Sequence, residues 1–126
     1  MKNFLMFVLF ALSVNVSANT DDKWDGSVLD EATIKKIQGA QYDYKRCIVK
    51  EMQKKGYASI ESRTATGAII KQCEPALADM RKVYLDAGVP GVIADRHLKR
   101  MRIQLTRRLL KQLMYQEAAK AAAGAK

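Results

Sequence analysis

Residues that interrupt regular structure are scarce in this sequence. Its 126 residues include only two prolines and seven glycines, a content too low for a collagen-like or low-complexity disordered chain. The length accommodates one domain. No internal repeat and no alternating, strand-like pattern of apolar residues occurs along the chain. We therefore expect a single all-α domain.

Side chains for catalysis or metal binding are also few. The sequence has one histidine, His97, and it lacks a glycine-rich phosphate loop and the G-x-S-x-G and H-E-x-x-H motifs. His97 and Met101 are four residues apart, and imidazole and thioether groups suit copper or haem. Methionines at helical spacing more often fill gaps in a core. We expect no enzymatic activity, no bound metal and no cofactor.

Only one stretch of the sequence is long and apolar, and it lies at the start. Phe4 to Leu12 is an unbroken apolar run that follows the basic Lys2, and Val16 and Ala18 form a small-x-small pattern. These features are typical of a secretory signal peptide over residues 1–18, cleaved near Ala18. A membrane anchor needs about 20 apolar residues, and no part of the mature chain provides them. The expected location is the periplasm or the medium.

The sequence contains two cysteines, Cys47 and Cys73, both in the mature part. A pair of cysteines in an exported chain predicts a disulfide bond. No C-x-x-C motif is present for redox catalysis, and no second cysteine or histidine cluster is present for zinc. A structural disulfide between Cys47 and Cys73 is therefore expected.

After a polar lead-in over residues 19–28, the apolar residues recur with the period of an α-helix. They predict a helical domain over residues 29–117, and the sequence after it, 118–126, is rich in alanine and lysine and is expected to fray. The predicted helices cover about residues 30–55, 60–86 and 92–119.

Pro75 falls inside the second predicted helix, which indicates a kink or a break near Glu74. The apolar stripe keeps its phase across the proline, which favours the kink. Residue 60 lies midway between the two cysteines, so an antiparallel hairpin that turns there brings Cys47 opposite Cys73. The predicted fold is an antiparallel three-helix bundle with one disulfide-stapled helical hairpin.

The sequence carries 22 lysines and arginines against 13 acidic residues, and the imbalance is greatest on the third predicted helix. Residues 96–111 include seven basic side chains and no acidic one. A solvated helix face usually mixes both signs of charge, so this run predicts binding to an acidic partner. The seven residues are Arg96, Lys99, Arg100, Arg102, Arg107, Arg108 and Lys111.

A second, narrower apolar seam beside the basic residues contains Val92, Ile103, Leu110 and Met114. Such a seam suits a partner chain or a second copy in a homodimer, with Asp79, Asp86 or Asp95 of the partner opposite the basic charges. The expected function is that of an adaptor, chaperone or accessory factor that binds an acidic protein surface in the envelope.

A polyanion or membrane-surface binder is the alternative, with lipopolysaccharide or anionic lipid as its ligand. The tyrosines and phenylalanines are not interleaved with the basic run, so no platform for stacking nucleobases is visible. We do not expect nucleic acid as the partner.

Overall fold

The computed structural model describes residues 29–124, and every regular element within this range is a helix. The expected signal peptide (1–18), its cleavage site near Ala18 and the lead-in (19–28) lie outside the described residues. The elements are α1 (Glu31–Met52), the 3-10 helix η3 (Lys55–Ser59), α2 (Ser62–Gln72), α3 (Glu74–Asp86) and α4 (Gly91–Gly124).

The beginnings of α1 and α2 are fixed by acidic side chains that cap the first free backbone amides. The carboxylate of Asp30 accepts a hydrogen bond of 2.7 Å from the backbone N–H of Thr33. Glu61 accepts hydrogen bonds of 3.0 Å from the backbone N–H groups of Arg63 and Thr64. These bonds hold the pKa of both carboxyl groups below its usual range, because they favour the charged form.

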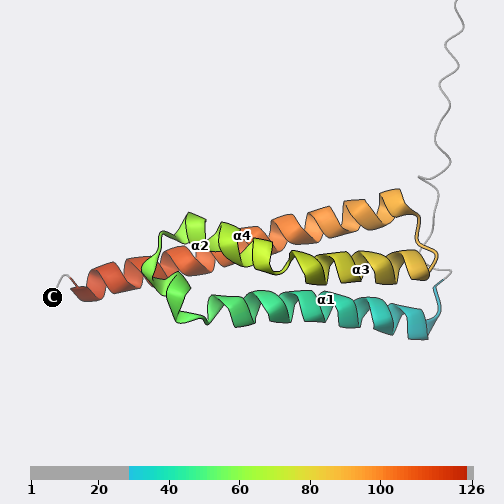
Figure 1. The fold of residues 1–126 in the computed structure, drawn as a ribbon, viewed down its shortest axis with the longest axis horizontal. Coiled ribbons are helices and arrows are strands. Elements are labelled where there is room, and N and C mark those ends of the chain that lie inside the picture. The colour runs from blue at the N-terminus through green and yellow to red at the C-terminus, as the bar shows by residue number, and fades with distance from the viewer. Residues whose placement is uncertain (1–28, 125–126) are drawn as a thin grey trace, which may run out of the picture.

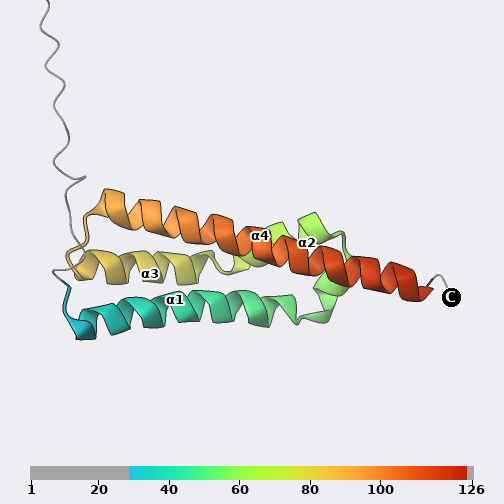
Figure 2. The ribbon, with the colours of Figure 1, turned by 180° about the vertical axis from the view of Figure 1, so that it is seen from behind.

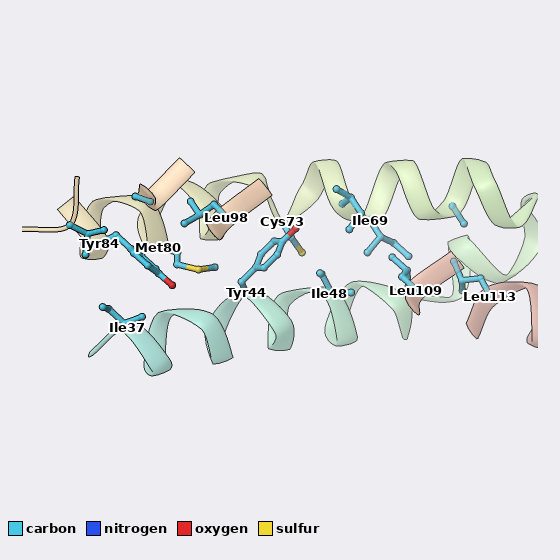
Figure 3. Packing of buried hydrophobic residues seen from close by; sticks show 14 residues of the cluster. Ile37, Tyr44, Ile48, Ile69, Cys73, Met80, Tyr84, Leu98, Leu109 and Leu113 are labelled. Atoms are coloured by element: carbon cyan, nitrogen blue, oxygen red, sulfur yellow. The ribbon is translucent and has the colours of Figure 1, made fainter. Parts of the chain in front are cut away.

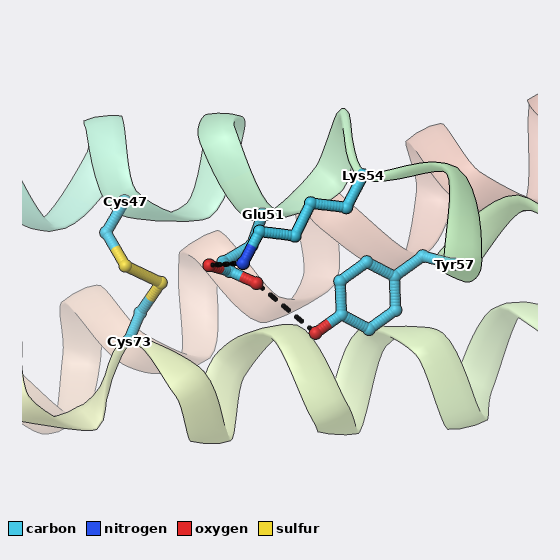
Figure 4. Close-up of polar contacts among 5 residues, drawn as sticks. All are labelled: Cys47, Glu51, Lys54, Tyr57 and Cys73. Carbon is cyan, nitrogen blue, oxygen red and sulfur yellow. Dashed lines mark hydrogen bonds and ion pairs between the residues drawn. A yellow bond between two sulfur atoms is a disulfide. The ribbon is translucent and has the colours of Figure 1, made fainter.

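The disulfide expected from the sequence is confirmed. Cys47 on α1 is bonded to Cys73, and the two Cα atoms are 5.9 Å apart. The connection that folds α2 back onto α1 contains η3 and a small polar cluster beside the disulfide (Figure 4). Here Glu51 accepts hydrogen bonds from Lys54 Nζ at 2.6 Å and from the Tyr57 hydroxyl at 3.3 Å. The bond from Lys54 to Glu51 raises the pKa of the Lys54 amine.

The single kinked helix expected over residues 60–86 is two helices. α2 ends at Gln72 and α3 begins at Glu74, with Cys73 between them. Pro75 lies in the first turn of α3, where its missing N–H costs little. Proline also disfavours helical geometry in the residue before it and clashes with the carbonyl one turn back. Four α-helices therefore take the place of the three that the sequence predicts.

Figures 1 and 2 show how the helices are arranged in space. α3 lies between α1 and the first half of α4, and the second half of α4 runs alongside α2. The α2–α3 segment runs opposite to both α1 and α4. The turn between α3 and α4 contains Gly88 with a φ of +80°, a left-handed conformation that glycine adopts at little cost.

One apolar core joins α1, the α2–α3 segment and α4 (Figure 3). Its largest fully buried side chains are Tyr44 from α1, Ile69 from α2, Cys73 from the junction of α2 and α3, and Met80 from α3. α4 contributes a stripe at helical spacing, whose buried members are Ala94, Leu98, Leu109 and Leu113. Each of the three helical segments thus contributes to one core.

The frayed tail expected over residues 118–126 is helical as far as Gly124, and residues 125–126 lie outside the described range. Alanine has the highest helix propensity, which favours continuation of the helix. Two long-range contacts also hold this end. The hydroxyl of Ser62 donates to the carboxylate of Glu117, and Lys120 Nζ donates to the Ala58 carbonyl oxygen at 2.9 Å.

Candidate functional site

α4 presents the candidate binding face. It has 34 residues, so it is about 51 Å long at the rise of an α-helix. Its core stripe lies against α3 and then α2, which leaves the opposite side outside the bundle. We call this opposite side the outward face. It runs from Arg96 to Ala118, a length of about 33 Å.

All seven basic residues predicted as partner-binding are solvent-exposed. At 100° per residue, Arg96, Arg100, Arg107 and Lys111 fall within about 60° of arc on the outward face. Arg102 points toward α3 instead, and its Nη2 is 3.1 Å from Glu74 Oε1. The structure therefore brings four of the seven predicted basic residues to one face, and Arg102 pairs with α3.

The acidic residue closest to this face in the sequence is directed away from it. Asp95 Oδ1 accepts a hydrogen bond of 2.6 Å from Arg81 Nε, and Asp95 Oδ2 lies 3.3 Å from Arg81 Nη2. The bond to Arg81 lowers the pKa of the Asp95 carboxyl and raises that of the guanidinium. Asp95 is thus committed to α3 of its own chain.

The remaining positive charges are not neutralised in the same way. Within residues 29–124, no ion pair with a carboxylate is formed by Lys99, Arg100, Arg107, Arg108 or Lys111. On α1, Lys35 pairs with Glu31 and Arg46 with Asp43, and the other lysines of that helix also form no ion pair within the described range. What distinguishes α4 is that residues 96–111 carry seven basic side chains and no acidic one.

Apolar side chains lie among these charges, as the second seam predicts. Val92 is 55% exposed, Ile103 is 40% exposed and Met114 is 52% exposed, while Leu110 is half-buried. Two shallow hollows follow the outward face and share Arg107 as a common wall. The first extends from Arg96 to Arg107 and is mainly polar in its side chains, and the second extends from Arg107 to Ala118 and is mainly apolar.

Tyr115 belongs to this face although the sequence analysis did not select it. Its side chain is 64% exposed, and Lys111 Nζ lies 5.9 Å from the centre of its ring, in the range of a cation–π contact. The signal was present in the sequence, because residues 111 and 115 are one helical turn apart. Tyr115 also lines the apolar hollow with Met114.

His97 and Met101 each contact other side chains of the described bundle. The His97 ring packs against Tyr84, with the ring centroids 6.1 Å apart, and Met101 is packed against the core. In the part of the chain that the structure describes, no group of three histidine, cysteine or acidic side chains is placed to hold a metal ion. Apart from its ring contact with Tyr84, His97 is solvent-exposed.

Among residues 29–124, no helix combines the length and the apolar character needed to cross a membrane. The long helix α4 fails on composition, because basic residues recur along it.

Comparison of the chain with models of known protein families, with curated proteins and with solved structures gives no match.

Proposed function

We propose that this protein is an exported, non-enzymatic adaptor, chaperone or accessory factor that binds an acidic protein segment along the outward face of α4. In this proposal the α2–α3 segment supports α4, against which it packs in the antiparallel direction. The observation that carries the proposal is the run of exposed basic side chains on the outward face, interleaved with exposed apolar ones and with no acidic residue between positions 96 and 116.

The chemistry of this face favours a protein over a simple polyanion. A polyanion needs positive charge alone, whereas Ile103, Met114 and Tyr115 add exposed apolar surface that gains free energy only when a partner removes it from water. An amphipathic acidic helix matches both features, with carboxylates opposite Arg100 and Arg107. Arginine suits bidentate contact with carboxylates.

The disulfide supports export, because such bonds persist in oxidising compartments. The leader over residues 1–18 supports the same assignment at the level of the sequence. Together they favour a partner in the bacterial envelope or outside the cell.

The test is capture of envelope components on the tagged mature protein, followed by washes at low and then high salt. We expect a protein that survives high salt, because the apolar contacts are not screened by ions. The double variant Arg100→Glu/Arg107→Glu should lose this protein. A matched control is Lys45→Glu/Lys50→Glu, which makes the same charge change at exposed positions of α1 and should retain it.

Two results would overturn the proposal. Retention of the same protein by Arg100→Glu/Arg107→Glu would show that the basic residues are not the contact. Retention of only anionic lipid or polysaccharide, released at high salt, would identify the face as a polyanion binder.

A further inference from the structure

The two halves of the outward face offer different chemistry to a partner. The hollow in the first half is lined by Arg96, Lys99, Arg100, Ile103, Gln104 and Arg107. The hollow in the second half is lined by Arg107, Leu110, Lys111, Met114, Tyr115 and Ala118. Basic side chains therefore predominate in the first half and apolar side chains in the second, and Arg107 marks the boundary between them.

The positive charge that does lie in the second half is close to an aromatic ring. Lys111 Nζ lies 5.9 Å from the centre of the Tyr115 ring, and the face of such a ring attracts a cation. The next basic residue along the chain is Lys120, which donates a hydrogen bond of 2.9 Å to the Ala58 carbonyl oxygen. The surface around Met114, which is 52% exposed, is thus mainly apolar.

The two acidic residues that flank the outward face in the sequence are bonded to other helices. Asp95 forms an ion pair with Arg81 of α3. Glu117 accepts a hydrogen bond from the Ser62 hydroxyl of α2. Carboxylates that complement the basic first half are therefore left for a partner to supply.

The part of α4 that carries the apolar half is fixed on its inner side. Leu109 and Leu113 are buried in the core, and the bonds of Glu117 and Lys120 join the following turns to α2 and η3. Figure 2 shows this part of α4 running alongside α2. A surface that is already held in one conformation loses little entropy on binding. The apolar half is therefore well placed to anchor a partner.

A helix is the partner conformation that fits this face. Within residues 29–124 every regular element is a helix, so this part of the chain offers no sheet edge to an extended segment. A helix satisfies its own backbone hydrogen bonds and presents a row of side chains one turn apart. The outward face is about 33 Å long, which corresponds to about 22 helical residues. Arg100 and Met114 are about 21 Å apart along α4, or about four turns.

We propose that the partner is one amphipathic helix in which acidic and apolar side chains are segregated along its length. Carboxylates in one half of this helix lie over the basic half of the outward face, and large apolar side chains in its other half lie in the hollow around Met114. This inference rests on the proposed function, which requires only that an acidic protein segment binds the face. It adds the order of acidic and apolar residues in that segment.

Two synthetic peptides of about 22 residues and identical composition test this order. The segregated peptide carries glutamates on one face of its first half and leucines on the same face of its second half. The interleaved peptide alternates glutamate and leucine along that face, and alanines elsewhere favour helicity in both. Binding to the exported protein is measured by calorimetry at low and high salt. At low salt the segregated peptide should bind several-fold more tightly than the interleaved one.

Variants of the two halves should respond differently to salt. Lys99→Gln/Arg100→Gln removes charge from the first half, so it should weaken binding of the segregated peptide at low salt and have little effect at high salt. Met114→Gln removes apolar surface from the second half, so it should weaken binding about fivefold at both salt concentrations. Because the two sites are about 21 Å apart, the triple variant should show the product of the two effects.

Matched changes on α1 control for the loss of charge and of apolar surface. Lys45→Gln/Lys50→Gln removes two positive charges at exposed positions. Val49→Gln makes an apolar side chain polar where it is 48% exposed. Both variants should bind the segregated peptide as the wild type does.

The outcomes separate this inference from the proposed function. Equal or tighter binding of the interleaved peptide would overturn the segregated order and leave the proposed function standing. Wild-type binding by Met114→Gln would overturn the inference in the same way, because the apolar half would not be the anchor. Failure of both peptides to bind, or binding that Lys99→Gln/Arg100→Gln does not weaken at low salt, would overturn the proposed function together with the inference.

Discussion

Arg81 on α3 and Asp95 on α4 are joined by two contacts of 2.6 and 3.3 Å, and this pair lies beside the basic residues of α4. Asp95 is the only acidic residue between positions 91 and 116. At 100° per residue, Asp95 lies about 140° around α4 from Arg100. Its position on the helix and its pairing with Arg81 both direct the carboxylate away from the outward face.

The first prediction concerns this pair. Arg81 holds the pKa of Asp95 below its usual range, so the carboxylate stabilises the fold above the ordinary aspartate pKa of about 3.9. That contribution is lost as the pH falls through the depressed value. Asp95→Asn should lower the melting temperature slightly at neutral pH, since the pair is exposed. The difference from wild type should vanish in acid, and a difference that grows in acid would contradict the assignment.

The second prediction separates binding from stability on the outward face. In Arg100→Glu/Arg107→Glu, each new carboxylate lies one turn from a basic residue, Arg96 or Lys111. Such i,i+4 pairs contribute about 0.2–0.5 kcal/mol each, and like-charge repulsion is relieved. The free energy of unfolding, measured with urea, should stay the same or rise by up to about 1 kcal/mol. A loss of more than about 1 kcal/mol would mean that these arginines hold the fold.

The third prediction concerns the disulfide. Joining Cys47 to Cys73 closes a loop with a sequence separation of 26, which restricts the unfolded chain by about 3.5 kcal/mol in the entropy model. Urea unfolding with and without a reducing agent should differ by an amount of this order. The variant Cys47→Ala/Cys73→Ala is the control, because its stability should not respond to the reductant. Equal stability of oxidised and reduced wild-type protein would contradict the prediction.

The sequence was sufficient for some parts of this fold and not for others. The pairing of Cys47 with Cys73 follows from a hairpin that turns midway between them, which is local information. Pro75 marks an interruption of the helix. The periodicity of apolar residues does not show whether the helix is kinked there or broken into two, because it is the same in both cases. What decides for a break is the backbone of Cys73, with φ −95° and ψ 3°, which the stripe does not encode.

The same distinction applies to the candidate site. The basic row is visible in the sequence because its members lie on one helix. Arg81 forms an ion pair with Asp95, and Glu74 forms one with Arg102. Both pairs depend on how α3 docks against α4, and neither follows from spacing along the chain. Lys120 shows the same limit, since its contact with Ala58 spans 62 residues and cannot be read from the sequence around it.

The fourth prediction concerns Tyr44, which is completely buried between α1 and the α2–α3 segment (Figure 3). No polar atom among residues 29–124 forms a hydrogen bond with its hydroxyl, and a buried unpaired hydroxyl costs about 1–3 kcal/mol. Tyr44→Phe keeps the ring and removes the hydroxyl, so it should raise the free energy of unfolding by about 1 kcal/mol. Tyr42→Phe on the same helix is the control, because that side chain is 62% exposed and the change should have little effect.

The alkaline limb of the stability curve tests the same hydroxyl independently. Burial raises the pKa of Tyr44, with a smaller opposing effect from Arg102, so the neutral form is favoured in the folded protein. Above the ordinary tyrosine pKa of about 10, the unfolded chain ionises first and the fold loses stability. The advantage of Tyr44→Phe in urea unfolding should therefore grow between neutral pH and about pH 11. An advantage that shrinks over this interval would mean that the hydroxyl is solvated or paired in the folded protein.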